Sequence, residues 1–289
     1  MGHQKRYFIY LFLLPAVIVS FVFMLYPIIW TIYISFTGYN LFQPGNNGFV
    51  GFANYIKVFE DPSFLSAFEN TVLFAIFYIP IMTMVSLLVG VLLYSIKKGS
   101  SVFRTLIFIP FAIPLTMATL MWAWVLIDGG VVSSMIAFLH FPHISWFGTP
   151  ISTIFTTTII TNWNLFGFNS IIILSGLYQI PREIFESAQL DGINWWQQFI
   201  KITLPLLKSN IFVVIILSLI SAFKAYAQIW SLSRGGGSVD VLYTYMYKMA
   251  FMYGYFNQAA VVAIVMGIMI ALGFYLSSKF VKGEGSSLW

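Results

Sequence analysis

Long apolar stretches, separated by short polar segments, form the main pattern along the chain. Each has about 20 residues or more, the length that an α-helix needs to cross the hydrocarbon core of a bilayer. The pattern predicts six membrane-spanning helices, at residues 7–35, 67–95, 104–127, 150–176, 209–231 and 257–280. The first stretch is too long for the apolar core of a secretory signal, and no A-x-A cleavage pattern follows it. We therefore expect an all-α integral membrane protein in which residues 1–289 form a single transmembrane domain.

The composition excludes a soluble protein. Hydrophobic residues make up 60% of the chain and charged residues 8%, and the mean hydropathy is +0.89. A soluble domain carries about 25% charged residues. The net charge of +5 is not gathered into a Lys/Arg-rich run that would bind nucleic acid. The chain has no cysteine, which excludes disulfides, thiol nucleophiles and cysteine metal sites.

The distribution of Lys and Arg predicts the orientation in the membrane. If the N-terminus is cytoplasmic, ten of the 14 basic residues fall in cytoplasmic segments and three in outside segments, whereas Lys224 lies within the fifth span. The cytoplasmic group is Lys5, Arg6, Lys97, Lys98, Arg104, Arg182, Lys201, Lys208, Lys279 and Lys282, and the outside group is Lys57, Arg234 and Lys248. Basic residues are enriched in cytoplasmic loops. We therefore expect both termini and the segment 180–205 to be cytoplasmic.

This segment, IPREIFESAQLDGINWWQQFIKITLP, is the longest polar interruption in the second half of the chain. Pro181 suits the first turn of a helix, and Gly192 suits the left-handed position just after its end. Asn194 can cap a second helix, with a glutamine three residues later in the capping-box position. Pro205 would end or kink that second helix. The segment 180–205 therefore predicts two short helices joined by a tight turn.

The same segment resembles the EAA loop of ATP-binding-cassette (ABC) importer permeases. In that family, Glu-Ala-Ala is followed by three variable residues, Gly, nine variable residues and Ile-x-Leu-Pro. The residues that match at this spacing are Glu186, Ser187, Ala188, Gly192, Ile202, Leu204 and Pro205, and Asp191 fits the common Asp-Gly form of the loop. The departure is Ser187 at the second position of the motif, in place of the first Ala, which exchanges one small residue for another.

Two other segments resemble the carbohydrate branch of this family, which includes maltose, multiple-sugar and glycerol-phosphate importers. They are residues 49–71, FVGFANYIKVFEDPSFLSAFENT, and residues 223–237, FKAYAQIWSLSRGGG. The usual form of the second motif ends in Gly-Gly-Pro, so Gly237 departs from it. The resemblance extends from Tyr7 to about Lys279. It implies the type I (MetI-like) importer permease fold, with six transmembrane helices.

The resemblance also implies partners and a role for the loop. The first helix of the segment 180–205 would be a coupling helix that docks in a cleft of a partner ATPase. Glu186 would face a basic or donor group there. The assembly would contain a second, related permease subunit, two ATPase subunits that use ATP and Mg, and an extracytoplasmic sugar-binding protein, in the cell (inner) membrane of a bacterium or archaeon. As an alternative, the loop is an ordinary amphipathic segment on the inner leaflet, in which Arg182 and Glu186 pair with each other.

Polar and aromatic side chains within the fourth and fifth spans are candidates for the translocation path. They are Asn162, Phe166 and Asn169 in the fourth span, and Ser221, Lys224, Tyr226 and Gln228 in the fifth. Amides suit the hydroxyls of a sugar, and aromatic faces suit its C–H surfaces. Resemblance to disaccharide permeases puts the first three near sugar-contacting positions, and the others would form a polar wall. Alternatively, the amides bond between helices and Lys224 extends to the outer headgroups.

Other functional classes lack the chemistry that they need. The chain has no G-x-x-x-x-G-K-[ST] sequence, so it does not bind ATP through a Walker loop. No acid lies deep in a predicted span, as ion-coupled carriers require, and no catalytic cluster suits a membrane enzyme. His140 and His143 have no third ligand nearby in the sequence, so we expect no metal site. A bare channel would not need the EAA spacing.

We therefore expect a non-catalytic permease subunit of an ATP-driven, binding-protein-dependent sugar importer, with an oligosaccharide as cargo. ATP would be hydrolysed on a partner chain, and this chain would need no cofactor of its own. The alternative keeps the importer and changes the cargo to glycerol phosphate, a polyol or another small polar solute.

Overall fold

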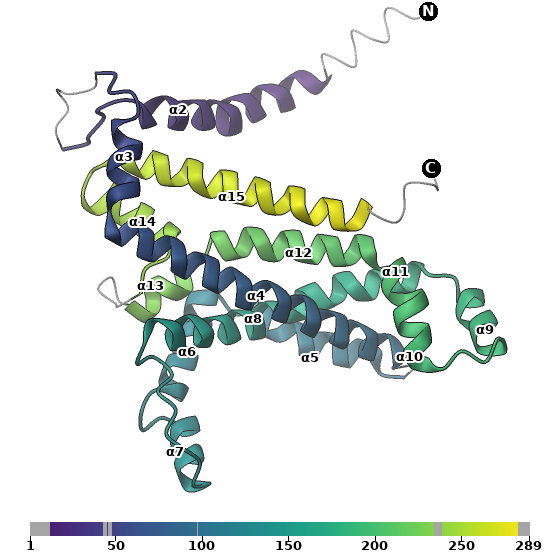
Figure 1. The fold of residues 1–289 in the computed structure, drawn as a ribbon. Coiled ribbons are helices and arrows are strands. Elements are labelled where there is room, and N and C mark those ends of the chain that lie inside the picture. The colour runs from purple at the N-terminus through teal and green to yellow at the C-terminus, as the bar shows by residue number, and fades with distance from the viewer. Residues whose placement is uncertain (1–11, 43–44, 46–47, 97, 234–238, 283–289) are drawn as a thin grey trace, which may run out of the picture. The chain divides into compact units, whose positions relative to one another are not determined.

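The computed structural model describes residues 12–42, 45, 48–96, 98–233 and 239–282 (Figure 1). These residues form helices and one isolated β-bridge, between Thr37 and Phe49, and they contain no β-strand. The predicted all-α class is confirmed. The chain divides into two compact units: unit 1 comprises Met1–Leu65 and Tyr245–Gly267, and unit 2 comprises Ser66–Thr244 and Ile268–Trp289.

Four helices in the described part of the chain are long and apolar enough to cross a membrane. They are Phe12–Ser35, with η1 (Phe21–Leu25) and α2 (Tyr26–Ser35); Pro62–Ser95, which is α4; Leu115–Phe138, with α6 (Leu115–Leu126) and α7 (Val131–Phe138); and Phe256–Lys279, within α15 (Phe256–Lys282). Trp195–Leu206 and Lys208–Phe223 give a fifth span if they are counted together, although they meet at a bend of 68°. The count of six spans remains a prediction.

Several predicted features lie outside the described residues. They are Lys5, Arg6, Lys97 and Arg234 of the charge pattern, residues 7–11 of the first span, and the glycines at 235–237.

Unit 1 is held together by side chains that bond across long stretches of sequence. Besides the helix Phe12–Ser35, it contains α3 (Ala53–Glu60), η3 (Lys248–Met252) and the first part of α15. Asn54 Nδ2 donates to the carbonyl oxygens of Ser35 and Thr37, both at 2.8 Å, and Asn257 Nδ2 donates to Asn54 Oδ1 at 2.9 Å. These bonds join the end of α2, α3 and the start of α15. They hold together the segment between the first two predicted spans, residues 36–66, which is predicted to lie outside.

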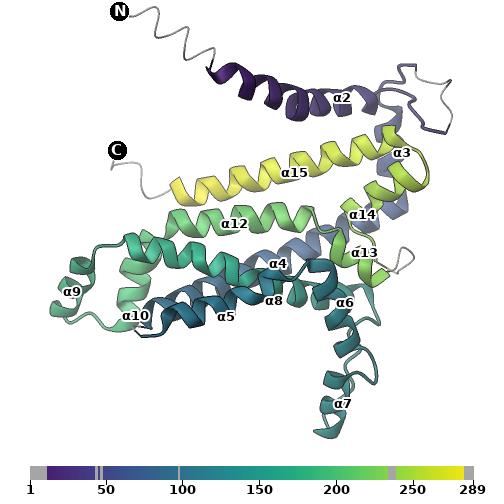
Figure 2. The ribbon, with the colours of Figure 1, turned by 180° about the vertical axis from the view of Figure 1, so that it is seen from behind.

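Unit 2 contains most of α4, together with α6, α7 and the last part of α15. Its other elements are α5 (Ser100–Ala112), α8 (Pro150–Gln179), α9 (Arg182–Leu190), α10 (Trp195–Gln198), η2 (Phe199–Thr203), α11 (Leu204–Leu206), α12 (Lys208–Phe223), α13 (Ala227–Ser233) and the first half of α14 (Leu242–Tyr247). Both views of the ribbon show α9 and α10 at one end of unit 2, and α6, α7 and α13 at the other end (Figures 1 and 2).

The core of unit 2 lies where α4, α8 and α12 pack together. Its buried side chains include Phe74, Tyr78 and Met82 of α4, Ile154, Ile173 and Leu177 of α8, and Val214 and Ala222 of α12. α8 also packs closely on α5 at Gly167, where an added Cβ would clash with the backbone carbonyl oxygen of Ile107. Small residues allow this kind of close approach between membrane helices.

α8 corresponds to the predicted span 150–176, but it is less apolar than the other long helices because it is rich in Thr and Asn. The hydroxyls of Thr157, Thr158 and Thr161 donate to carbonyl oxygens four residues earlier, at 2.7–2.9 Å. Their polar atoms are therefore satisfied within the helix, and it can lie in a buried position.

Two predicted spans are divided in the structure. The predicted span 104–127 falls in α5 and α6, with extended backbone at Ile113 between them. Pro114 explains this break, because proline disfavours helical backbone at the preceding residue. The predicted span 209–231 falls in α12 and α13, because the chain leaves the helix over residues 224–226.

Candidate functional site

The first helix of the segment 180–205 begins and ends at local sequence signals. Pro181 is the N-cap residue of α9, and Glu183 lies in its first turn, where the helix dipole favours a carboxylate. Gly192 follows the helix with φ +72°. Its N–H donates to the carbonyl oxygen of Gln189, and the N–H of Ile193 donates to that of Ala188, both at 3.1 Å. These two bonds form a Schellman motif. The predicted glycine stop is confirmed.

The second helix begins with the predicted capping box. Asn194 Oδ1 accepts from the N–H of Gln197 at 2.9 Å, and Gln197 Oε1 accepts from the N–H of Asn194 at 3.2 Å. The helix continues through η2 and α11, and α12 then starts at an angle of 68°. Pro205 precedes this bend, and Leu207, which lies between the two helices, is fully buried. The predicted kink is therefore present.

The 180–205 loop presents apolar and charged side chains at its surface. Leu190 is 89% exposed and Trp195 is 65% exposed. Of the residues predicted to contact an ATPase, Glu186, Ser187, Asp191, Gly192 and Pro205 are exposed, Ile202 and Leu204 are half-buried, and Ala188 is buried. No ion pair joins Arg182 to Glu186 in the part of the chain that the structure describes. The carboxylate of Glu186 therefore forms no ion pair with Arg182 of the same helix.

A groove of about 390 Å³ runs along one side of α9. Its lining residues are Glu183, Ile184, Ser187, Ala188, Asp191, Ile193 and Ile202. The structure therefore brings four of the predicted coupling residues together around one groove. Glu186, Leu204 and Pro205 are not among the residues that line it.

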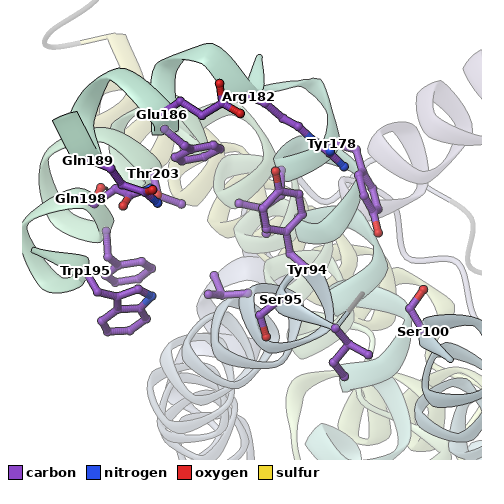
Figure 3. Close-up of a pocket in the computed structure, with 15 residues that line it drawn as sticks. Tyr94, Ser95, Ser100, Tyr178, Arg182, Glu186, Gln189, Trp195, Gln198 and Thr203 are labelled. Carbon is purple, nitrogen blue, oxygen red and sulfur yellow. The ribbon is translucent and has the colours of Figure 1, made fainter. Parts of the chain in front are cut away.

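A cavity of about 820 Å³ is lined by residues of the loop and of the ends of α4, α5 and α8 (Figure 3). Aromatic rings and polar side chains alternate around it; they include Tyr94, Tyr178, Phe185, Trp195 and Phe199, with Arg182, Glu186, Gln189 and Gln198. The ring of Tyr94 contacts those of Tyr178 and Phe185, with centroids 5.5 Å and 6.2 Å away. The contact with Phe185 joins α9 to the end of α4, beside an open space.

Sequence reasoning did not single out Tyr94 and Tyr178, although both line this cavity. They lie at the ends of predicted spans, where a tyrosine is usually assigned to the interfacial belt. Their position next to the segment 180–205 was the available signal. Only the folded chain shows that the ends of α4 and α8 meet beneath α9.

The structure places the predicted sugar-contacting residues of α8 inside unit 2. Asn162 and Asn169 are 5% and 4% exposed. Each donates to the backbone carbonyl oxygen four residues earlier, at 2.9 Å and 3.1 Å, and Asn169 also approaches Met82 Sδ at 3.4 Å. Both Oδ1 atoms are buried without a hydrogen-bond partner among the described residues. Phe166 is half-buried and lies on the same stripe of α8, because the three positions are spaced by four and three residues.

The second predicted set lies around the break between α12 and α13. Lys224 follows the last residue of α12, and its side chain is exposed. Ser221 is half-buried, and Gln228 is 3% exposed. The half-buried ring of Tyr226 stacks on that of Trp230, with centroids 5.4 Å apart. Lys224 is therefore at a helix end rather than in the middle of a continuous span.

Of the two histidines at positions 140 and 143, His143 has a side-chain contact in the structure. His143 Nε2 lies 2.9 Å from Asp128 Oδ1, and both side chains are exposed. Within the described residues, no group of three or more His, Asp or Glu side chains could hold a metal ion.

Known proteins resemble the chain along nearly its full length. The family described as "Binding-protein-dependent transport system inner membrane component" matches residues 82–282. The chain is 31% identical to the lactose transport system permease protein of Rhizobium radiobacter, over 94% of each chain. It is 29% identical to the arabinooligosaccharides transport system permease protein of Bacillus subtilis, over 98% of this chain and 92% of that one.

Among solved structures, a chain of a bacterial ABC transporter involved in the import of the acidic polysaccharide alginate has a similar fold. The TM-score is 0.80 and the sequence identity is 19%, over 98% of this chain and 97% of the other. At this identity the likeness concerns the fold.

Proposed function

The chain belongs to the family of binding-protein-dependent transport system inner membrane components, and we propose that it forms one half of the translocation path of an ATP-driven sugar importer. As a family member it is a non-catalytic, multi-pass permease subunit. The proposed cargo is a sugar or oligosaccharide, because the relatives described above are named for lactose and arabinooligosaccharides. The proposed partners are a second, related permease, two ATPase subunits that bind ATP and Mg, and an extracytoplasmic binding protein.

The observation that carries the coupling role is that residues of the 180–205 loop themselves make the hydrogen bonds that close its turn. Its turn is closed by a Schellman motif on one side and a capping box on the other, so its two helices keep their geometry when the loop moves. Its surface carries the carboxylate of Glu186, which forms no ion pair with Arg182, and the exposed side chain of Leu190. Exposed apolar side chains beside a charged group are typical of a surface that binds another protein. We propose that α9 docks on the ATPase.

The cavity beneath α9 supports the same role. It leaves space between the loop and the ends of α4, α5 and α8. A loop that rested tightly on these helix ends could not change its angle without unpacking them. With a cavity of about 820 Å³, the loop can shift as the ATPases open and close, while the contact between Phe185 and Tyr94 transmits the motion to α4.

The proposed sugar contacts are the side-chain amides of Asn162 and Asn169 in α8. Asn162 and Asn169 each keep a buried side-chain oxygen that accepts no hydrogen bond from the described residues, and sugar hydroxyls are donors. Both side chains are buried, so a sugar reaches them only when α8 moves relative to its neighbours. Alternation between outward-open and inward-open states would supply this movement.

A second cargo is supported by one specific observation. The ammonium group of Lys224 is exposed at the break after α12, where it could pair with an anionic solute such as glycerol phosphate. Uptake into proteoliposomes that contain the complete importer would separate the two cargoes. Lys224→Gln should abolish the uptake of glycerol phosphate if that is the cargo, and it should only reduce the uptake of a neutral disaccharide.

The test of the coupling role is the double variant Glu186→Ala/Gly192→Val in the complete importer. Valine at position 192 has open space around it, but its backbone would be strained at φ +72° by about 1–2 kcal/mol. Loss of a charge-assisted contact from Glu186 would cost about 1.5–3 kcal/mol of binding. We expect normal membrane insertion but at least tenfold less ATPase retained on purification, and loss of cargo-stimulated ATP hydrolysis.

Lys201→Ala, which removes an exposed charge of the same segment outside the EAA residues, is the matched control and should behave as wild type. If the double variant retains the ATPase and transports normally, α9 is not the coupling helix.

A further inference from the structure

Near one end of unit 2, Arg104 forms no ion pair with a carboxylate of the described residues. Its Nη2 donates to Tyr178 OH and, at 3.2 Å, to Ser100 Oγ; both residues are labelled in Figure 3. The guanidinium lies over the ring of Tyr178, 5.2 Å from its centroid. Its Nε is buried without a hydrogen-bond partner, and no ion pair to Arg104 is found among the described residues. The group is held in one orientation by neutral atoms, and its charge is not compensated.

Arg104 is also one of the residues that line an apolar groove of about 470 Å³. Its lining residues are Arg104, Thr105, Phe108, Ile109 and Ala112 of α5, with Ile171 of α8. The five positions of α5 are spaced by one and three residues in turn, so they form one stripe along the helix. The Thr105 hydroxyl already donates to the carbonyl oxygen of Ser101, at 3.0 Å. The groove surface is almost entirely apolar, and Arg104 is the one charged residue among those that line it.

The dimensions of the stripe fit one leaflet of a bilayer. The stripe from Arg104 to Ala112 covers eight residue steps, or about 12 Å at about 1.5 Å per residue. Half of the hydrocarbon core is about 15 Å thick. One end of the stripe is cationic and the rest is apolar, which is the arrangement of an anionic phospholipid. The predicted orientation puts Arg104 at the cytoplasmic surface, where anionic lipids are enriched.

We propose that this stripe binds one anionic phospholipid of the inner leaflet, with its phosphate on Arg104 and one acyl chain along Phe108, Ile109 and Ala112. Both hydrogens of Nη2 are used by Tyr178 and Ser100 and Nε is buried, so the two N–H bonds of Nη1 are the ones that would donate to phosphate oxygens. The contacts with Tyr178 and Ser100 hold the guanidinium in place and reduce the entropy lost when these bonds form. The bound lipid would also brace α5, which is short and ends at the break at Ile113. The inference does not depend on the solute that is transported.

The test measures lipid retained by the purified complete importer. The complex is exchanged into detergent micelles that contain equal amounts of phosphatidylglycerol and phosphatidylcholine, and bound lipids are counted by native mass spectrometry. We expect one phosphatidylglycerol per copy of this chain in preference to phosphatidylcholine. Arg104→Gln should lower that preference roughly fivefold, the effect of one basic group near a membrane surface. Arg104→Lys, which keeps the charge, should retain part of the preference.

Two further variants separate a lipid from other anions and from general surface charge. Ile109→Trp would fill the groove from an exposed position and should release the lipid although Arg104 remains. Lys201→Gln removes a cation elsewhere and should leave binding unchanged. Excess inorganic phosphate should not displace the lipid.

Three results would overturn the proposal. They are equal retention of both lipids by the wild type, an equal loss in Lys201→Gln, and displacement by phosphate in the wild type.

Discussion

The turn after α9 and the break after α5 both interrupt helices, but their backbone groups are satisfied in different ways. At the turn, the bonds are made by residues no more than five positions apart, through the Schellman motif and the capping box. At the break, Asn164 of α8 donates to the carbonyl oxygens of Pro110 at 2.7 Å and Ile113 at 3.1 Å. The partner is thus more than 50 residues away in the sequence.

This difference separates a turn whose hydrogen bonds are local from a break whose hydrogen bonds depend on another helix. The turn of the 180–205 loop is closed by hydrogen bonds among residues of the loop itself. The break after α5 keeps its shape only while α8 lies against α5, because free carbonyl groups in an apolar environment are costly. Variants at the two places should therefore act on different properties, and we order them by the expected loss of stability.

The largest effect is expected where α5 and α8 touch. Gly167→Ala places a Cβ against the backbone at Ile107, which cannot yield as a side chain would, so the two helices must separate. We expect a loss of about 3 kcal/mol in unfolding free energy, measured by denaturant unfolding in detergent. Gly267→Ala is the control, because a Cβ there meets nothing within 4 Å. Equal stability of the two variants would contradict the close packing of α5 on α8.

The next effect concerns the hydrogen bonds from Asn164 to the break after α5. Asn164→Leu leaves the carbonyl oxygen of Ile113 without its side-chain donor and should cost about 1–3 kcal/mol. Asn169→Leu removes only a bond to a carbonyl oxygen of its own helix and a weak contact to sulfur, so it should cost less, yet it should lower sugar uptake. Stability and uptake measured on both variants test this contrast. If Asn169→Leu transports normally, Asn169 is not a sugar contact.

A smaller effect is expected from the local caps. Asn194→Ala removes the acceptor for the N–H of Gln197 and should cost about 1 kcal/mol, confined to the loop. Global unfolding should hardly change, whereas ATPase retention should fall. Asn194→Ser is the matched variant, because serine caps a helix about as well as asparagine. A loss of global stability in Asn194→Ala would mean that the loop is not independent of the rest of unit 2.

The smallest effect concerns a hydrogen bond in unit 1 between residues far apart in the sequence. Tyr245 OH donates to Asp61 Oδ2 at 2.6 Å. Burial alone would raise the pKa of Asp61, but hydrogen bonds from Tyr245 and Ser63 bring it below its usual 3.8. Burial, then the bond to Asp61 and its charge, raise the pKa of Tyr245 above its usual 10.0.

The stability from Asp61 is therefore present above about pH 3.8 and is lost as the pH falls through its folded pKa. The stability from Tyr245 is present below about pH 10 and is lost as the pH rises through its folded pKa. In Tyr245→Phe, melting temperatures measured from pH 3 to 9 should fall less toward acid than in the wild type, because Asp61 has lost the bond that lowers its pKa. An unchanged acid slope would show that this bond does not stabilise unit 1.

The helices and the caps of the 180–205 loop could be predicted because their causes are local. Long apolar runs can satisfy their backbone groups in a bilayer as helices, and Gly192, Asn194 and Pro205 act on neighbours only a few residues away. The break at Ile113 was missed because Pro110 and Pro114 are tolerated in a membrane helix when another helix satisfies the freed groups. That helix supplies Asn164, whose role only the packing of α8 against α5 reveals.

The sequence by itself determined the all-α membrane class, the two helices of the 180–205 loop and the turn between them, since each depends on hydropathy over one span or on bonds within one turn. Tertiary structure decided which side of α8 is buried, so that Asn162 and Asn169 lie inside unit 2. It also placed Tyr94 and Tyr178 beneath α9 and left Arg104 without a carboxylate partner among the described residues. Each of these depends on side chains that meet only when distant helices pack, and hydropathy along one helix carries no information about its neighbours.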